Sequence, residues 1–332
     1  MDKMVQTLPR KKTIDKNNTM KNIYLREINW TSAARNIFFL LRKDIKELFI
    51  EQRQITTYNS ILLSSILSEE YRKKYDKEIN NLLKLGRYTT YPSQDIALMN
   101  VQAFYDEKKK MPYVMHVGKK LFFPHNYSLH DAAKCYMGYI YGDCFLGEAP
   151  NGAPHQYQSS DFCVKDGDVV VDVGSAEGLF GLDVIETVSK IYLIERDPKW
   201  IKALKATFEP YSDKVVFINK LIADKDSRKT ITLGTLLKNE INVSLFIKMD
   251  IEGYEVSVVK SGHDFLEQNM DICLSCCTYH HNDDAFELER QFNDLGYATE
   301  YSNGYMLFAR YDQPVYPYFR RGLIRAKKNK SE

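Results

Sequence analysis

The sequence lacks the long apolar runs that a membrane-spanning helix requires. Of its 332 residues 44% are hydrophobic and 27% are charged, and no apolar stretch approaches the ~20 residues of a bilayer span. Residues 1–21 are polar and basic and contain no apolar core of a secretory signal. We therefore expect a globular protein without a transmembrane segment.

Regularly spaced cysteines and a strong net charge are also missing. The six cysteines show no framework spacing, which predicts reduced thiols and a cytoplasmic location. The net charge of +2 gives no large field for a polyanion, so no nucleic-acid partner is expected. Positive charge is concentrated over residues 320–330, and we predict a basic C-terminal tail over 313–332.

The most informative stretch that is present runs from Gly167 to Gly178. Its β-branched run, 169–173, is typical of a strand covered on both faces, and Asp172 brings a carboxylate near its end. Gly174 and Gly178 then allow the backbone to approach a ligand at the start of a helix. This pattern predicts a cofactor crevice at the carboxyl edge of a parallel sheet.

The spacing of the glycines decides which cofactor fits. Gly174, Gly178 and Gly181 follow GxxxGxxG, whereas a pyrophosphate clamp uses GxGxxG, so a dinucleotide is disfavoured. The next strand, 191–194, ends at Glu195, about 20 residues past the first glycine, where a carboxylate reaches both ribose hydroxyls. Together these features favour S-adenosylmethionine. The alternative interpretation is an ordinary α/β turn followed by a surface glutamate.

Hydrophobic periodicity predicts an α/β organisation. From residue 162 onward strands and helices alternate, which indicates a mostly parallel sheet with helices on both faces. We divide the chain into a helical N-terminal region at 1–110, a hairpin, helix and polar lid loop at 111–161, a cofactor domain at 162–312 and the tail at 313–332. The N-terminal helices are candidates for a homo-oligomer contact.

A second strand, ending in the run Lys248-Met249-Asp250-Ile251-Glu252-Gly253-Tyr254-Glu255, carries a family signature. Over about Val164 to Phe308 the chain resembles the FkbM family of S-adenosylmethionine-dependent methyltransferases. The resemblance implies a Rossmann-like class I methyltransferase fold with a seven-stranded sheet. It also implies a set of cofactor contacts: Asp172, Gly174, Glu177 and Gly178 at the methionine part, Glu195 at the ribose, Ala223 and Asp224 at the adenine, and Asp250 on the sulfonium side.

Catalytic candidates follow at the same expected edge of the sheet. His280 is our first candidate for the base that removes a proton from the acceptor, and His155, in the polar loop, is the second. Both histidines have the alternative of being satisfied surface or cap residues, and Asp250 has that of a helix N-terminal acid. Relatives carry Tyr-His-Lys where this chain has His281 in place of the lysine.

Metal sites receive little support from the sequence. Cys273 and Cys276 lie on a predicted strand and face opposite sides, which argues against zinc and favours buried structural thiols. A divalent ion that binds sugar hydroxyls would use Asp250, Asp283 and Asp284, but their spacing shows no dedicated site.

The leading hypothesis is an O-methyltransferase that acts on a hydroxyl group of a glycan or another metabolite. A nucleic-acid amino-methyltransferase would carry an Asn/Asp-Pro-Pro-aromatic turn, and the run after Asp250 has no proline. Two alternatives stay open: a nicotinamide-dependent oxidoreductase or epimerase on a similar sheet, and a cofactor-binding protein without turnover.

Overall fold

The computed structural model describes residues 32–86, 88, 90, 101–143, 153–240, 242–268 and 271–328. The chain divides into two compact units, residues 1–51 and 52–332. The predicted divisions at 110, 161 and 312 stay predictions. In the first unit the described residues belong to the helix α2 (Ser32–Leu67), whose remainder lies in the second unit. Within the ranges given above, no helix combines the length and the apolar character needed to cross a bilayer.

The second unit begins with a small helical cluster. The last turns of α2 are followed by α3 (Glu69–Lys74) and α4 (Asp76–Leu85). The Ser68 hydroxyl caps α3 by accepting from the Tyr71 amide, and Gly86 ends α4 in the left-handed conformation. The aromatic ring of Tyr75 stacks on Phe319 with 4.5 Å between ring centroids. Helices are confirmed over 32–85, but residues 103–106, inside the region 1–110 that was predicted to be helical, form a strand. Residues 52–86 pack onto the segment before the last strand.

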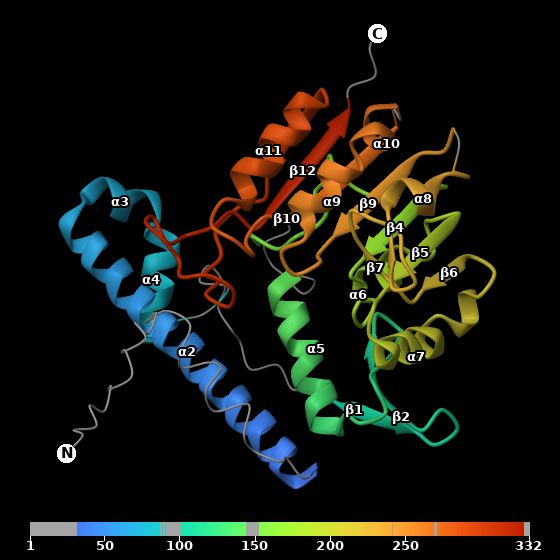
Figure 1. Ribbon diagram of the computed structural model, residues 1–332, viewed down its shortest axis with the longest axis horizontal. Helices are drawn as coiled ribbons and strands as arrows, with labels where there is room; N and C mark the ends of the chain where they lie inside the picture. Colours follow the sequence, from blue (N-terminus) through green and yellow to red (C-terminus); the bar gives the residue numbers. More distant parts are fainter. Residues whose placement is uncertain are drawn as a thin grey trace, which may run out of the picture. The chain divides into compact units, whose positions relative to one another are not determined.

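A seven-stranded sheet forms the centre of the second unit (Figure 1). Its order is β11-β12-β10-β9-β4-β5-β6, and only β12 runs antiparallel to its neighbours. The strands are β4 (Val169–Val173), β5 (Lys190–Ile194), β6 (Val215–Ile218), β9 (Leu245–Met249), β10 (Ile272–Cys277), β11 (Tyr297–Tyr301) and β12 (Leu323–Lys328). The predicted Rossmann-like, mostly parallel sheet is confirmed.

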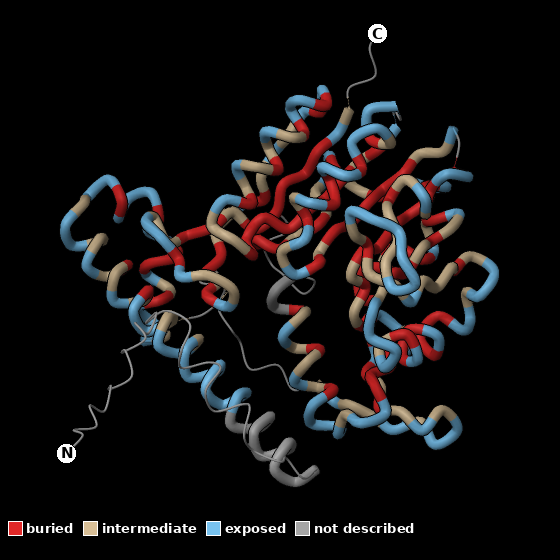
Figure 2. The backbone as a smooth tube through the Cα atoms, in the orientation of Figure 1, coloured by how far each residue is buried: buried red, intermediate tan, exposed pale blue. Residues whose placement is uncertain are grey.

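Helices cover both faces of this sheet, and the side chains of each strand alternate between them. One face packs against α5 (Leu129–Asp143), α6 (Leu179–Val184) and α7 (Pro198–Thr207). The other packs against α8 (Leu233–Leu237), α9 (Glu255–Ser261), α10 (His263–Gln268) and α11 (Asp284–Asp294). Figure 2 shows the strands between these helices as the buried part of the unit. Every residue of β4 and β9 is buried, as a two-sided parallel strand requires.

The remaining elements of the second unit are short. A three-stranded sheet contains β1 (Ala103–Asp106), β2 (Met111–His116) and β3 (Lys119–Phe122), and it confirms the predicted hairpin around Gly118. A small pair joins β7 (Leu221–Ile222) to β8 (Thr230–Ile231), and η1 (Glu209–Tyr211) follows α7. Of the predicted lid loop at 142–160, residues 144–152 lie outside the described part of the chain.

The prediction of a basic tail over 313–332 is wrong for residues 323–328. These residues form β12, which lies between β10 and β11. Leu323, Ile324 and Ala326 are fully buried, and the Arg325 guanidinium donates to the backbone oxygen of Gln156 and to Glu300. A stretch rich in arginine and lysine suggested a solvated tail, but the apolar residues between the charges have the pattern of an inner strand. The edge strand β11 pairs antiparallel with β12.

Candidate functional site

Two cavities lie at the carboxyl edge of the parallel strands, where β4, β5 and β9 end. The first, of about 350 Å³, is lined by Glu195, Trp200 and Ile222 among others. The second, of about 160 Å³, has His155 in its wall. Residues lining both are Tyr139, Gly174, Ala176, Asp250 and Glu252. The two cavities therefore meet at the turn after β4 and the turn after β9, as expected for a ligand site on such a sheet.

Gly174 is required because these two turns touch. Its φ of +77° lies in the left-handed region, and a Cβ atom would stand 1.9 Å from the backbone oxygen of Asp250. Gly178 has a different role from the one predicted. It precedes α6 at φ +84°, and a Cβ atom there would stand 2.5 Å from Leu204 Cδ2. Gly178 thus permits α6 to pack on α7 and does not line either cavity.

Glu195 lies where the sequence predicted, at the end of β5 in the wall of the first cavity. Its Oε2 accepts from the Ala176 amide at 3.1 Å and its Oε1 from the Asp197 amide at 2.7 Å, which fixes the carboxylate. Ala223 and Asp224, expected at the adenine, are not among the lining residues. The chain reaches the cavity slightly earlier, at residues 220–222.

Asp172 does not line either cavity, so the prediction that it faces the ligand is corrected. It lies opposite Lys248 in the register of β4 and β9, and the two side chains form a buried ion pair of 2.9 Å. Lys248 also donates to the Gly174 oxygen at 2.7 Å. Burial alone would lower the pKa of Lys248, but the carboxylates of Asp172 and Asp250 outweigh it and hold that pKa above its usual range. Lys248, together with the predicted Glu177, lines the second cavity.

Asp250 is the centre of the site, because both of its oxygens have partners and it lines both cavities. Tyr157 donates to Oδ2 at 3.0 Å, and His155 Nε2 lies 3.4 Å from the same atom. On the other side His280 Nε2 lies 3.5 Å from Oδ1. Burial would raise the pKa of Asp250, but the two histidines and Lys248 outweigh it and hold this pKa well below its usual range.

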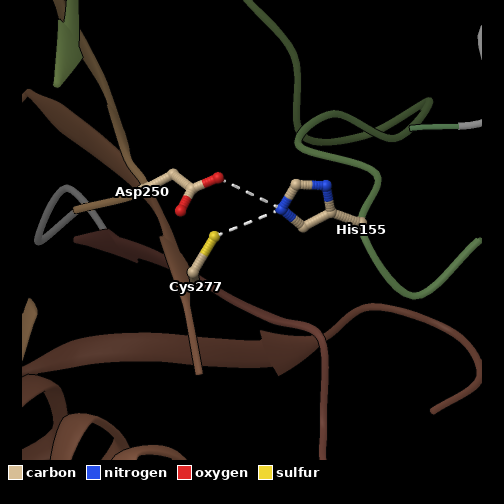
Figure 3. Close-up of side chains that lie close together, drawn as sticks. All are labelled: His155, Asp250 and Cys277. Carbon is tan, nitrogen blue, oxygen red and sulfur yellow. Dashed lines mark hydrogen bonds and ion pairs between the residues drawn. The ribbon is translucent and has the colours of Figure 1, made fainter. Parts of the chain in front are cut away.

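Several polar atoms surround the Nε2 atom of His155 in the second cavity. Cys277 Sγ lies 3.4 Å from it, and Figure 3 shows Cys277 and Asp250 on the same side of the ring, both facing this nitrogen. The hydroxyls of Tyr157 and Tyr279 lie 3.2 and 3.3 Å away. Neither Cys277 nor these tyrosines were predicted from the sequence to belong to the site. The one available signal was that Tyr157 and Tyr279 lie within two residues of the candidate histidines His155 and His280.

His280, the first candidate for the base, lies behind Asp250. It is 1% exposed, does not line either cavity, and places Nδ1 3.0 Å from Glu255 Oε1. Its pKa is raised: burial by itself would lower it, but the nearby carboxylates of Glu255 and Asp250 outweigh that effect. His280 therefore has no direct path to an acceptor in either cavity, whereas His155 does.

Potential metal ligands gather differently from the prediction. Among the described residues two groups have ligand atoms close together, namely His155 with Asp250 and Cys277, and Asp250 with Glu255 and His280. Neither group contains Asp283 or Asp284, so the predicted ion-binding acids are not brought together. Cys273 and Cys276 pack into the cores on opposite faces of the sheet, as predicted, and do not form a zinc site.

Part of the chain is similar to a known family of methyltransferases. Residues 188–299 match the family model described as the methyltransferase FkbM domain, which confirms the resemblance. No curated protein matches the chain. Among solved structures, precorrin-6y C5,15-methyltransferase of Geobacter metallireducens is 13% identical with a TM-score of 0.35, covering 50% of this chain and 82% of its own. Trm5b of Pyrococcus abyssi is 16% identical with a TM-score of 0.34, covering 70% and 57%. These structural likenesses are partial and carry no argument about function. The similarity to methyltransferases therefore rests on the family model that matches residues 188–299.

Proposed function

We propose that this S-adenosylmethionine-dependent methyltransferase transfers the methyl group to a hydroxyl group of a glycan or another small metabolite. The observation that carries the proposal is the meeting of two cavities at Asp250. One contains a strand-end glutamate suited to a ribose, and the other contains an imidazole against a carboxylate. This arrangement places a proton acceptor beside the point where the reacting groups would meet.

The residues present fit the cofactor. Glu195 offers oxygens to the two ribose hydroxyls, and Trp200 and Ile222 supply apolar surface for the adenine. In the second cavity Glu177 and Lys248 offer opposite charges to the ammonium and carboxylate of the methionine part. Asp250, at the junction, places its negative charge on the side of the sulfonium.

S-adenosylmethionine, when bound, would supply an activated methyl carbon: an acceptor oxygen would form the new bond to this carbon while the bond to sulfur breaks and its electron pair stays on sulfur. The protein must orient the acceptor and receive the proton that its hydroxyl loses. We assign that proton to His155, because its imidazole lines the second cavity. Asp250 stabilises the imidazolium by its charge, and Tyr157 fixes the Asp250 carboxylate by its hydrogen bond. This assignment replaces His280 as the base.

Calorimetry with S-adenosylmethionine, S-adenosylhomocysteine and NAD tests the cofactor. We expect the first two to bind at the same site and to compete. Binding of NAD alone would overturn the proposal in favour of an oxidoreductase.

The acceptor class is identified with methyl-labelled cofactor, offered together with a panel of saccharides and a metabolite extract from cytoplasm. Label found only on amines would overturn the hydroxyl assignment.

His155→Gln tests the base. We expect cofactor affinity within about twofold of the parent and methyl transfer reduced about 10²–10⁴-fold, the usual contribution of a positioned base. The matched control is His263→Gln on α10, where the side chain is half-exposed and does not line either cavity. Full turnover of His155→Gln would remove His155 from the mechanism.

A further inference from the structure

We propose that Glu255 and His280 are positioning residues that hold the Asp250 carboxylate at the junction of the two cavities through a buried carboxylate–imidazole–carboxylate bridge. The inference rests on the proposed function, because it concerns the carboxylate that faces the cofactor's sulfonium. It gives a role to two residues that do not line either cavity themselves.

The bridge is defined by two contacts of one imidazole ring. His280 Nδ1 lies 3.0 Å from Glu255 Oε1, and His280 Nε2 lies 3.5 Å from Asp250 Oδ1. The side chains of His280 and Glu255 are 1% and 0% exposed, whereas that of Asp250 is 21% exposed. Only the Asp250 end of the bridge therefore reaches the cavities, and its other end is anchored in the protein interior.

Glu255 also fixes the turn from which Asp250 projects. Its Oε1 accepts from the Ile251 amide at 2.8 Å and its Oε2 from the Gly253 amide at 3.0 Å. Within this turn Glu252 has a φ of +60° and Gly253 a φ of +95°. Left-handed conformations in succession need outside support, especially at a residue other than glycine. The same carboxylate thus secures the backbone of the turn and one edge of His280.

The surroundings of His280 keep its two contacts in place. Rings of Tyr279, Phe308 and Tyr311 lie 4.3, 5.4 and 6.1 Å from its ring centroid. Arg320 donates to its backbone oxygen at 3.0 Å. Three carboxylates raise the pKa of His280: Glu255 on α9, and Asp250 and Glu252 after β9. A fourth carboxylate, Asp284 on α11, also interacts with His280 by charge, because His280 lowers the pKa of Asp284. This surplus of negative charge favours the imidazolium, whose positive charge attracts both carboxylates.

A fixed and ionised Asp250 distinguishes charged from neutral forms of the cofactor. S-adenosylmethionine carries a sulfonium, whereas S-adenosylhomocysteine carries a neutral thioether in the same skeleton. Both ligands carry the same adenosine, which Glu195 is proposed to bind. The affinity for S-adenosylmethionine divided by that for S-adenosylhomocysteine therefore reports the charge and position of Asp250, and its measurement needs no acceptor. A loss of the bridge should lower this ratio.

Calorimetric Kd values for both ligands test the inference in the full chain. The variants His280→Asn and His280→Gln separate the two contacts, because an Asn amide replaces Nδ1 and a Gln amide replaces Nε2. We expect His280→Asn and Glu255→Gln to raise the Kd for S-adenosylmethionine about tenfold. The Kd for S-adenosylhomocysteine should stay within about twofold of the parent value. His280→Gln should retain more of the parent ratio. His263→Asn and Glu267→Gln, in exposed positions of α10, serve as matched controls.

Melting temperatures separate positioning from folding. An unchanged ratio in His280→Asn and Glu255→Gln, with only a lower Tm, would overturn the inference and leave the two residues a purely structural role. If one variant does not fold, the ratio in the other and in His280→Gln decides. Failure of the parent protein to bind either ligand would instead refute the proposed function, so the two failures are distinguishable.

Discussion

The ammonium group of Lys248 lies 2.9 Å from the carboxylate of Asp172, and both side chains are buried between neighbouring strands. Removal of one partner leaves a buried charge without compensation, which typically costs about 3–5 kcal/mol. We expect Lys248→Met to lower the free energy of unfolding by about this amount in denaturant titrations. The double variant Asp172→Asn with Lys248→Met should be more stable than Lys248→Met alone. Equal stability of the two variants would contradict this account of the pair.

Gly174→Ala should destabilise the protein through its contact with the turn after β9. At φ +77° the new Cβ atom would stand 1.9 Å from the Asp250 oxygen, so the backbone must shift. We expect a loss of at least about 1–3 kcal/mol, the usual cost of such strain, together with weaker cofactor binding. Gly118→Ala is a matched control, because Gly118 has φ +79° and nothing within 4 Å of the new atom. A similar loss of stability in both variants would mean that the left-handed backbone conformation alone is the cause, and not the contact with the Asp250 oxygen.

Glu195→Ala should weaken both forms of the cofactor alike. Each carries the ribose that Glu195 is proposed to bind, and a charged hydrogen bond typically contributes about 1.5–3 kcal/mol. We expect Kd for both ligands to rise about 10- to 100-fold, with their ratio unchanged, in contrast to the variants of the Asp250 bridge. Glu267→Ala, an exposed glutamate of α10, provides the control. Unaltered affinities would place the ribose elsewhere.

The stabilisation by His280 should depend on pH in a defined direction. Its folded pKa is raised above the ordinary 6.5, since Glu255 and Asp250 outweigh burial. A raised pKa stabilises the fold fully below the unfolded value, and this contribution is lost as the pH rises through the folded value. The difference in unfolding free energy between the parent and His280→Asn should therefore be largest below pH 6.5 and shrink at higher pH. A difference that grows with pH would show that His280 is buried in its neutral form.

Local sequence patterns were sufficient for most of the second unit. The β-branched run of β4, the alternation of strands and helices and the signature around Asp250 predicted the sheet, its mostly parallel direction and the edge at which the site lies. Glu195 lines the first cavity, at the place that strand direction and distance along the chain predict, and its contact with a ribose stays a prediction. The strand β12 was missed because its charged residues suggested a solvated tail. Its pairing with β10 and β11 depends on residues far away in the chain, which a local pattern does not reveal.

The sequence by itself thus determined the chemistry of the chain: an acidic sheet edge, the FkbM signature and the residue types that suit a methyl donor. Only the tertiary structure decided which of those residues face the cavities. Register paired Asp172 with Lys248, and the turn after β9 placed His280 behind Asp250 while bringing His155 from a distant loop to its front. Periodicity reports which face of a strand a side chain occupies, whereas contact between residues far apart in the chain depends on how the elements pack.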